Sequence, residues 1–135
     1  LCVGTEEFIT SLKSIVSSSP TRSVKDEEAM VPDLIESSIK FLNENNISYA
    51  DFCEDQNDPR IAVIAIGIAE YNLSQKAQTR TTVGGCLLQS LGLKGVGEQS
   101  VKAVAKRVGK AVLKKAVPYV GWGVFAVEMA MCIAE

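Results

Sequence analysis

The sequence predicts an all-α fold, a single compact bundle of five or six helices. Apolar residues recur at intervals of three and four along several segments, and the helix-start signal Asp58-Pro59 precedes a long, almost uncharged one. The chain of 135 residues is long enough to bury roughly two-thirds of its unfolded surface around one core. Aromatic residues make up only 6% of the chain, so we expect small side chains to fill that core.

The first helix is predicted at residues 5–17. Apolar side chains recur there at helical spacing, Thr5 can cap the helix, and Glu6 and Glu7 lie in the first turn, where the helix dipole favours them. A polar link is expected to follow, to about Asp26.

A second helix is predicted to start at Pro32-Asp33. Its apolar pattern continues until a group of asparagines between residues 43 and 46 ends it. Residues 48–54 fit one or two further helical turns, with Tyr49, Phe52 and Cys53 on the inner side.

The run at residues 60–73 is apolar on nearly every side. By composition alone it fits a buried strand as well as a buried helix. The cap and proline at Asp58-Pro59, the alanine content and the polar continuation to about Gln78 favour a helix. We therefore predict a central helix around which the others pack.

A short apolar segment at residues 81–91 precedes three closely spaced glycines, Gly92, Gly95 and Gly97. The spacing matches neither glycine-rich phosphate-binding motif, and no clear strand leads into it. We interpret the glycines as a hinge before the next helix.

The helix predicted after Ser100 has two chemically distinct faces. Val101, Val104, Ala105, Val108 and Val112 fall on one side, and five cations fall on the other: Lys102, Lys106, Arg107, Lys110 and Lys114. Like charges four residues apart repel, so an anionic neighbour is expected. This neighbour is either the acidic part of this chain, an anionic lipid surface or a nucleic acid. A nucleic acid is disfavoured, because no aromatic or amide side chains that could stack on or read bases lie between the cations.

Residues 116–133 contain one charge, Glu128, and form the most apolar stretch of the chain. Eighteen residues lie at the lower limit for crossing a hydrocarbon layer, and Glu128 together with Pro118 and two glycines argues against a permanent span. The segment fits either a buried core helix or an insertable one that forms a helical hairpin with the basic helix at Pro118. The residues predicted to insert or to fill the core are Val120, Trp122, Phe125 and Met129.

The sequence contains no histidine, which removes the commonest general base and the commonest metal ligand. We expect no enzymatic activity, no cofactor and no metal site. The four cysteines, Cys2, Cys53, Cys86 and Cys132, have no zinc-binding spacing. Two disulfides in a secreted or periplasmic protein are the favoured interpretation, and four buried thiols in a reduced protein are the alternative.

Gly84-Gly85 is followed by a cationic, glycine-rich tail that contains Cys86 and Cys132. In its layout, this part of the chain (residues 84–135) resembles bacteriocin precursors, in which a leader ends in a double glycine and a membrane-active peptide follows. The resemblance implies processing after Gly85 and a disulfide in the tail. A glycine pair at a helix bend is the alternative interpretation.

These observations predict one helical domain over residues 1–135, with an acidic half (1–85) and a cationic and apolar C-terminal unit (86–135). Residues 98–135 hold six basic and three acidic side chains, whereas residues 1–97 hold eight basic and thirteen acidic ones. The first functional hypothesis is an exported, toxin-like or antimicrobial-like protein whose C-terminal helices engage membranes. The alternative is a protein-interaction or immunity-type module in which the same helices are ordinary core. The oligomeric state stays open.

Overall fold

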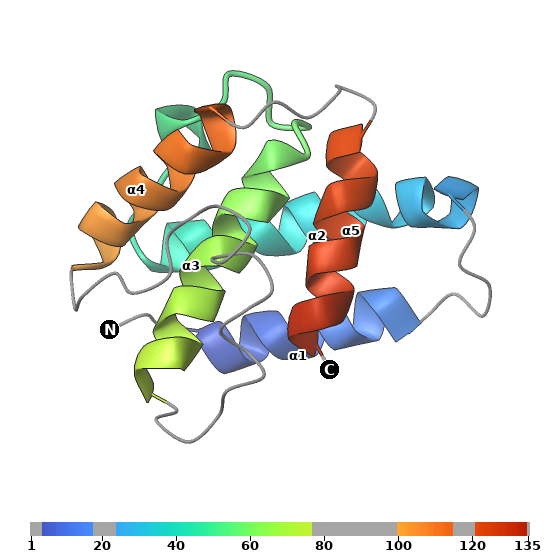
Figure 1. Cartoon of the computed structure of the whole chain (residues 1–135), viewed down its shortest axis with the longest axis horizontal. Helices are drawn as coiled ribbons and strands as arrows, with labels where there is room; N and C mark the ends of the chain where they lie inside the picture. Colours follow the sequence, from blue (N-terminus) through green and yellow to red (C-terminus); the bar gives the residue numbers. More distant parts are fainter. Residues whose placement is uncertain (1–3, 18–23, 77–99, 115–120, 135) are drawn as a thin grey trace.

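The computed structural model describes residues 4–17, 24–76, 100–114 and 121–134 (Figure 1). These residues contain helices and no strand, so the predicted all-α bundle is confirmed. The five α-helices and one short 3-10 helix are α1 (Thr5–Ser17), α2 (Val24–Glu44), η1 (Tyr49–Asp51), α3 (Arg60–Lys76), α4 (Val101–Lys114) and α5 (Gly121–Ala134). The predicted segment at residues 81–91, the glycine hinge, Gly84-Gly85 and the turn at Pro118 lie outside the described residues.

Helix α3 is the centre of the bundle and packs against all four other α-helices (Figure 1). Every residue from position 61 to position 72 is buried. A helix that is apolar on all sides requires neighbours on all sides, which explains the central position. Asp58 caps its start, since one carboxylate oxygen accepts the backbone N–H of Arg60 at 2.9 Å. The helical interpretation of this run is therefore confirmed.

Helices α1 and α2 pack against each other through an aromatic pair. The rings of Phe8 and Phe41 stack with centroids 4.7 Å apart and planes 5° from parallel. The start of α1 is also joined to α3, because the amide of Asn72 donates a hydrogen bond to the Thr5 hydroxyl at 3.0 Å, and both side chains are buried. The boundaries predicted for the first helix are confirmed.

The predicted start of the second helix at Pro32-Asp33 is wrong, because α2 begins at Val24 and includes Pro32. A proline inside a helix removes one backbone hydrogen bond and costs about 3 kcal/mol or more. Met30, Leu34 and Ile35 are buried on both sides of the proline. Each such burial contributes about 1.5–3 kcal/mol, so together they offset the cost of continuing the helix through Pro32.

The expected hairpin of the last two helices is not formed as predicted. Helix α4 packs against α3, whereas α5 packs against α1, α2 and α3, and α4 and α5 do not pack extensively against each other. Figure 1 shows α3 between them. Helix α3 buries apolar side chains on its whole circumference, so it offers separate faces to α4 and α5. Each helix buries its apolar face against the N-terminal helices instead of against the other.

Candidate functional site

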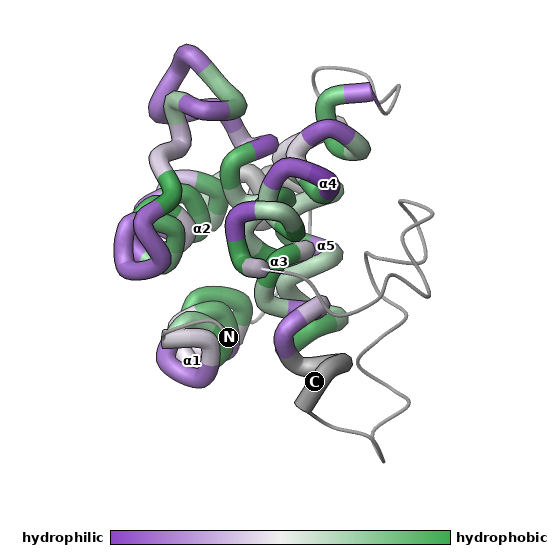
Figure 2. Tube along the Cα trace, turned by 90° about the vertical axis from the view of Figure 1, so that its left-hand side faces the viewer, coloured by the Kyte–Doolittle hydropathy of each residue, from purple (hydrophilic) through white to green (hydrophobic). Residues whose placement is uncertain are grey.

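The surface of α4 carries the strongest separation of charge from apolar residues in the described part of the chain. Val104, Ala105, Val108, Gly109 and Val112 are buried. The five predicted cations are all exposed, and we call them the cationic face: Lys102, Lys106, Arg107, Lys110 and Lys114. Figure 2 shows hydrophilic and hydrophobic residues alternating along α4 accordingly.

The start of α4 is set by Ser100, as its sequence indicates. The Ser100 hydroxyl accepts the backbone N–H of Ala103 at 3.2 Å, and its carbonyl accepts the N–H of Val104 at 3.0 Å. This cap fixes where the first helical turn begins. The valine face of α4 is buried and α4 packs against α3, so the cationic face on the opposite side of the helix points away from α3.

The cationic face is not neutralised by the acidic helices within the described part of the chain. The ion pair found there joins Arg60 to Asp58, and none of the five cations has a hydrogen bond or an ion pair with a described residue. Repulsion between cations four residues apart costs a few tenths of a kcal/mol, roughly, per pair. An anion bound along the helix would relieve this repulsion.

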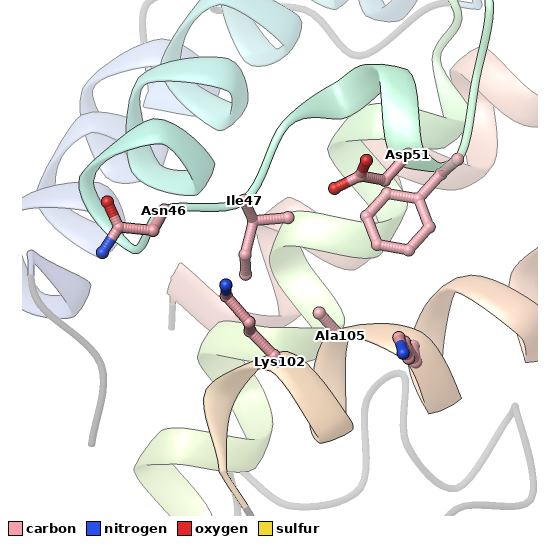
Figure 3. A pocket seen from close by; sticks show the side chains of 7 residues that line it. Asn46, Ile47, Asp51, Lys102 and Ala105 are labelled. Atoms are coloured by element: carbon pink, nitrogen blue, oxygen red, sulfur yellow. The ribbon is translucent and has the colours of Figure 1, made fainter.

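A cleft of about 380 Å³ lies between α4 and residues 46–52 (Figure 3). Lys102 and Lys106 of the cationic face, with Asn46 and Asp51 opposite, are exposed at its rim. Its apolar lining consists of Ile47, Phe52 and Ala105. In Figure 3, Lys102 extends across the cleft towards Ile47.

Local hydrogen bonds at the end of α2 hold one wall of the cleft in place. Asn46 has a φ of 62°, and the N–H of Ile47 donates to Leu42 at 2.8 Å while the N–H of Asn46 donates to Asn43 at 3.1 Å. This is the Schellman arrangement of a helix C-terminus, with asparagine in the left-handed conformation. The asparagines therefore end α2 as predicted, and they turn Ile47 inward.

The position of Phe52, on the same side of the cleft as Ile47, depends on a close approach to Gly109 of α4. A Cβ atom at position 109 would lie 2.5 Å from Cδ1 and Cε1 of the Phe52 ring, so only glycine allows the ring to lie there. Sequence reasoning placed Phe52 on an inner side but identified neither Gly109 nor the cleft. The two residues are far apart in sequence, and the residues around a glycine inside a helix do not show which distant side chain will lie against it.

The predicted apolar residues of α5 are part of the core. Trp122 is buried and meets Phe125 edge to face, with ring centroids 5.6 Å apart, and the half-buried Phe125 and Met129 pack against the same core. Val120 lies outside the described residues. Leu113 is the one large apolar side chain among the described residues that is exposed, at 41%. None of the described helices is both long and apolar enough to cross a membrane.

The structure corrects the prediction of a disulfide at Cys53, which is a free, buried thiol. Burial and the nearby Asp58 carboxylate raise the pKa of this thiol to about 11. Burial also acts to raise the pKa of Asp58, but hydrogen bonds from Arg60 and its charge outweigh it and leave that pKa below its ordinary value. Cys132 is disulfide-bonded, and Cys2 and Cys86 lie outside the described residues.

We expect Cys53 to resist alkylation by iodoacetamide in the folded protein at neutral pH. The reactive form is the thiolate, which both burial and the raised pKa suppress. Peptide mass spectrometry after brief labelling, with and without urea, measures this. Cys53 should be modified only in urea, without any reductant, and rapid labelling of the native chain at Cys53 would contradict the prediction.

Compared with known proteins, the chain matches no protein-family model, no curated protein and no solved structure.

Proposed function

We propose that the protein is an exported, non-enzymatic interaction module whose cationic face binds an acidic segment of a partner protein. The observation that carries the proposal is the set of five exposed cations on α4, which have no ionic partner among the described residues. The apolar face of the same helix is buried, so the cations are presented by a packed helix. Binding thus requires no rearrangement of the bundle.

The distribution of apolar surface favours a protein partner over membrane insertion. Insertion needs an apolar face, and Val104, Val108, Val112 and Trp122 are all buried in the bundle core. The apolar surface next to the cationic face is instead concave, because it lines the cleft beside Lys102 and Lys106. A protein side chain can enter such a cleft, whereas a flat lipid surface cannot.

Engagement of an anionic membrane is the second candidate function, in line with the resemblance to bacteriocin precursors. The observation that favours it is the exposed Leu113, which lies on α4 beside Lys114. Each cation near an anionic lipid surface contributes about 1 kcal/mol, so the folded protein would adsorb through electrostatic attraction. Insertion would require α4 or α5 to leave the bundle.

The test compares two probes with the full chain at low and physiological salt. One probe is a fluorescent peptide of glutamates flanking one central phenylalanine, and the other is a set of phosphatidylserine–phosphatidylcholine vesicles. We expect salt-sensitive binding of the peptide, and a decrease in affinity of about five- to tenfold when Lys106 and Lys110 are both changed to Gln, because two exposed ion pairs are lost.

The matched control is Lys13→Gln with Lys40→Gln, which removes the same charge from exposed positions on α1 and α2. This control should bind the peptide like the wild type. An equal loss in both double variants would show that net charge alone drives binding, which contradicts the proposal. Binding to the vesicles without binding to the peptide would support the second candidate, and binding to neither would overturn both.

A further inference from the structure

We infer that the cleft between α4 and residues 46–52 is an anchor pocket for one large apolar side chain of an acidic peptide segment. The inference rests on the proposed function and adds what the cationic face alone does not specify. A volume of about 380 Å³ lies at the small end of the range of about 300–1,000 Å³ for ligand pockets. This size suits one or two side chains better than a folded domain.

The walls of the cleft are held in place before any ligand binds. Ile47 is buried and is set by the hydrogen bonds that end α2, and Phe52 lies against the backbone of α4 at Gly109. Ser48 caps the short helix between them, since its hydroxyl accepts the N–H of Ala50 at 3.2 Å. Preformed walls lower the ordering cost of binding, so a single apolar anchor can contribute measurably to affinity.

The rim determines which anchors are accepted. Lys102 and Lys106 supply two cations for carboxylates that flank the anchor, and the amide of Asn46 can hydrogen-bond to a peptide backbone. Among the described residues that line the cleft, Asp51 is the one carboxylate. It can accept a backbone N–H from the bound segment while repelling a carboxylate placed on its side. The rim therefore favours an apolar residue with acidic neighbours on the α4 side.

The experiment compares the glutamate peptide having a central phenylalanine with the same peptide having a central alanine. On the wild-type chain, we expect the alanine peptide to bind about tenfold more weakly, because the buried aromatic surface is lost. Lys102→Gln should weaken binding of the phenylalanine peptide by about fivefold. Lys114→Gln removes the same charge from the same helix but away from the cleft, and should change the affinity by less than about twofold.

A second pair of variants tests whether removing a negative charge at the rim strengthens binding of the phenylalanine peptide. Asp51→Asn should strengthen binding about twofold, because it removes the negative charge at the rim. Glu54→Gln, an exposed carboxylate nearby that does not line the cleft, should leave the affinity unchanged. All four positions are exposed, so the variants are expected to fold, and thermal unfolding verifies this.

The outcomes separate this inference from the proposed function. If the two peptides bind equally well, and Lys102→Gln and Lys114→Gln weaken binding equally, the cationic face binds acidic segments without an anchor pocket and the inference is overturned. If neither peptide binds, the proposed function fails together with the inference. A tenfold preference for phenylalanine that Lys102→Gln and Asp51→Asn shift in opposite directions would support both.

Discussion

Replacing Val108 with aspartate is expected to lower the free energy of unfolding by about 3–5 kcal/mol, because an unpaired carboxylate would be buried in the core. Val108 is 1% exposed and lies on the face of α4 that packs against α3. Small domains have a total stability of about 5–15 kcal/mol, so this variant loses much of it. Urea unfolding, followed by circular dichroism and by the fluorescence of Trp122, measures the change.

The matched control for this variant is Leu113→Asp, which introduces the same residue and the same charge into the same helix. Leu113 is 41% exposed, so the change should stay within about 0.5 kcal/mol. Because Trp122 lies on α5, its fluorescence reports on the core that α5 shares with α1, α2 and α3. If α4 unfolds together with the rest of the bundle, circular dichroism and Trp122 fluorescence should report the same unfolding transition for Val108→Asp. An early loss of helical signal with an unchanged tryptophan transition would show instead that α4 detaches alone.

Replacing Phe41 with alanine is expected to cost about 3–5 kcal/mol, which is the range for removing a buried aromatic side chain. Phe41 is 1% exposed on α2, and its ring stacks on that of Phe8 on α1. The substitution removes both the burial of the ring and its stacking contact with Phe8. The midpoint of urea unfolding measures the loss.

Phe52→Ala is the matched control, because the same substitution is made at a half-buried ring that packs on the surface of α4. Folding removes less of the Phe52 ring's apolar surface from water than of the Phe41 ring's. We therefore expect a smaller decrease in the free energy of unfolding than at Phe41. Equal losses at the two positions would contradict the expectation that the fully buried Phe41 contributes more to stability than the half-buried Phe52.

Much of the helical structure could be predicted from local signals in the sequence. The boundaries of α1 follow from its apolar periodicity, although Thr5, predicted as its cap, lies inside the helix and accepts a hydrogen bond from Asn72 instead. The start of α3 at Asp58-Pro59 and the start of α4 at Ser100 follow from their caps. The division of α4 into a valine face and a cationic face is also a property of spacing alone. These features depend on residues within one or two turns of each other, which is why a linear sequence contains them.

The features that failed or were missed depend on contacts between distant residues. Helix α2 continues through Pro32 because burial of the apolar side chains on both sides outweighs the cost of a proline inside a helix. The sequence prediction started the helix at this proline. Cys53 is a free thiol buried in the core formed by several helices, although counting cysteines suggested that it was paired. In both cases, tertiary burial overrode a local or compositional rule.

The sequence by itself determined that the chain is helical, that residues 60–73 are apolar enough to form a central helix, and that one helix carries a cationic face. Only the tertiary structure decided that α4 and α5 pack separately on α3, and that Phe52 reaches Gly109 to form a cleft beside Lys102 and Lys106. The physical reason is that helix propensity and amphipathicity act over a few residues, whereas the choice of packing partner depends on which faces the complete set of helices leaves available.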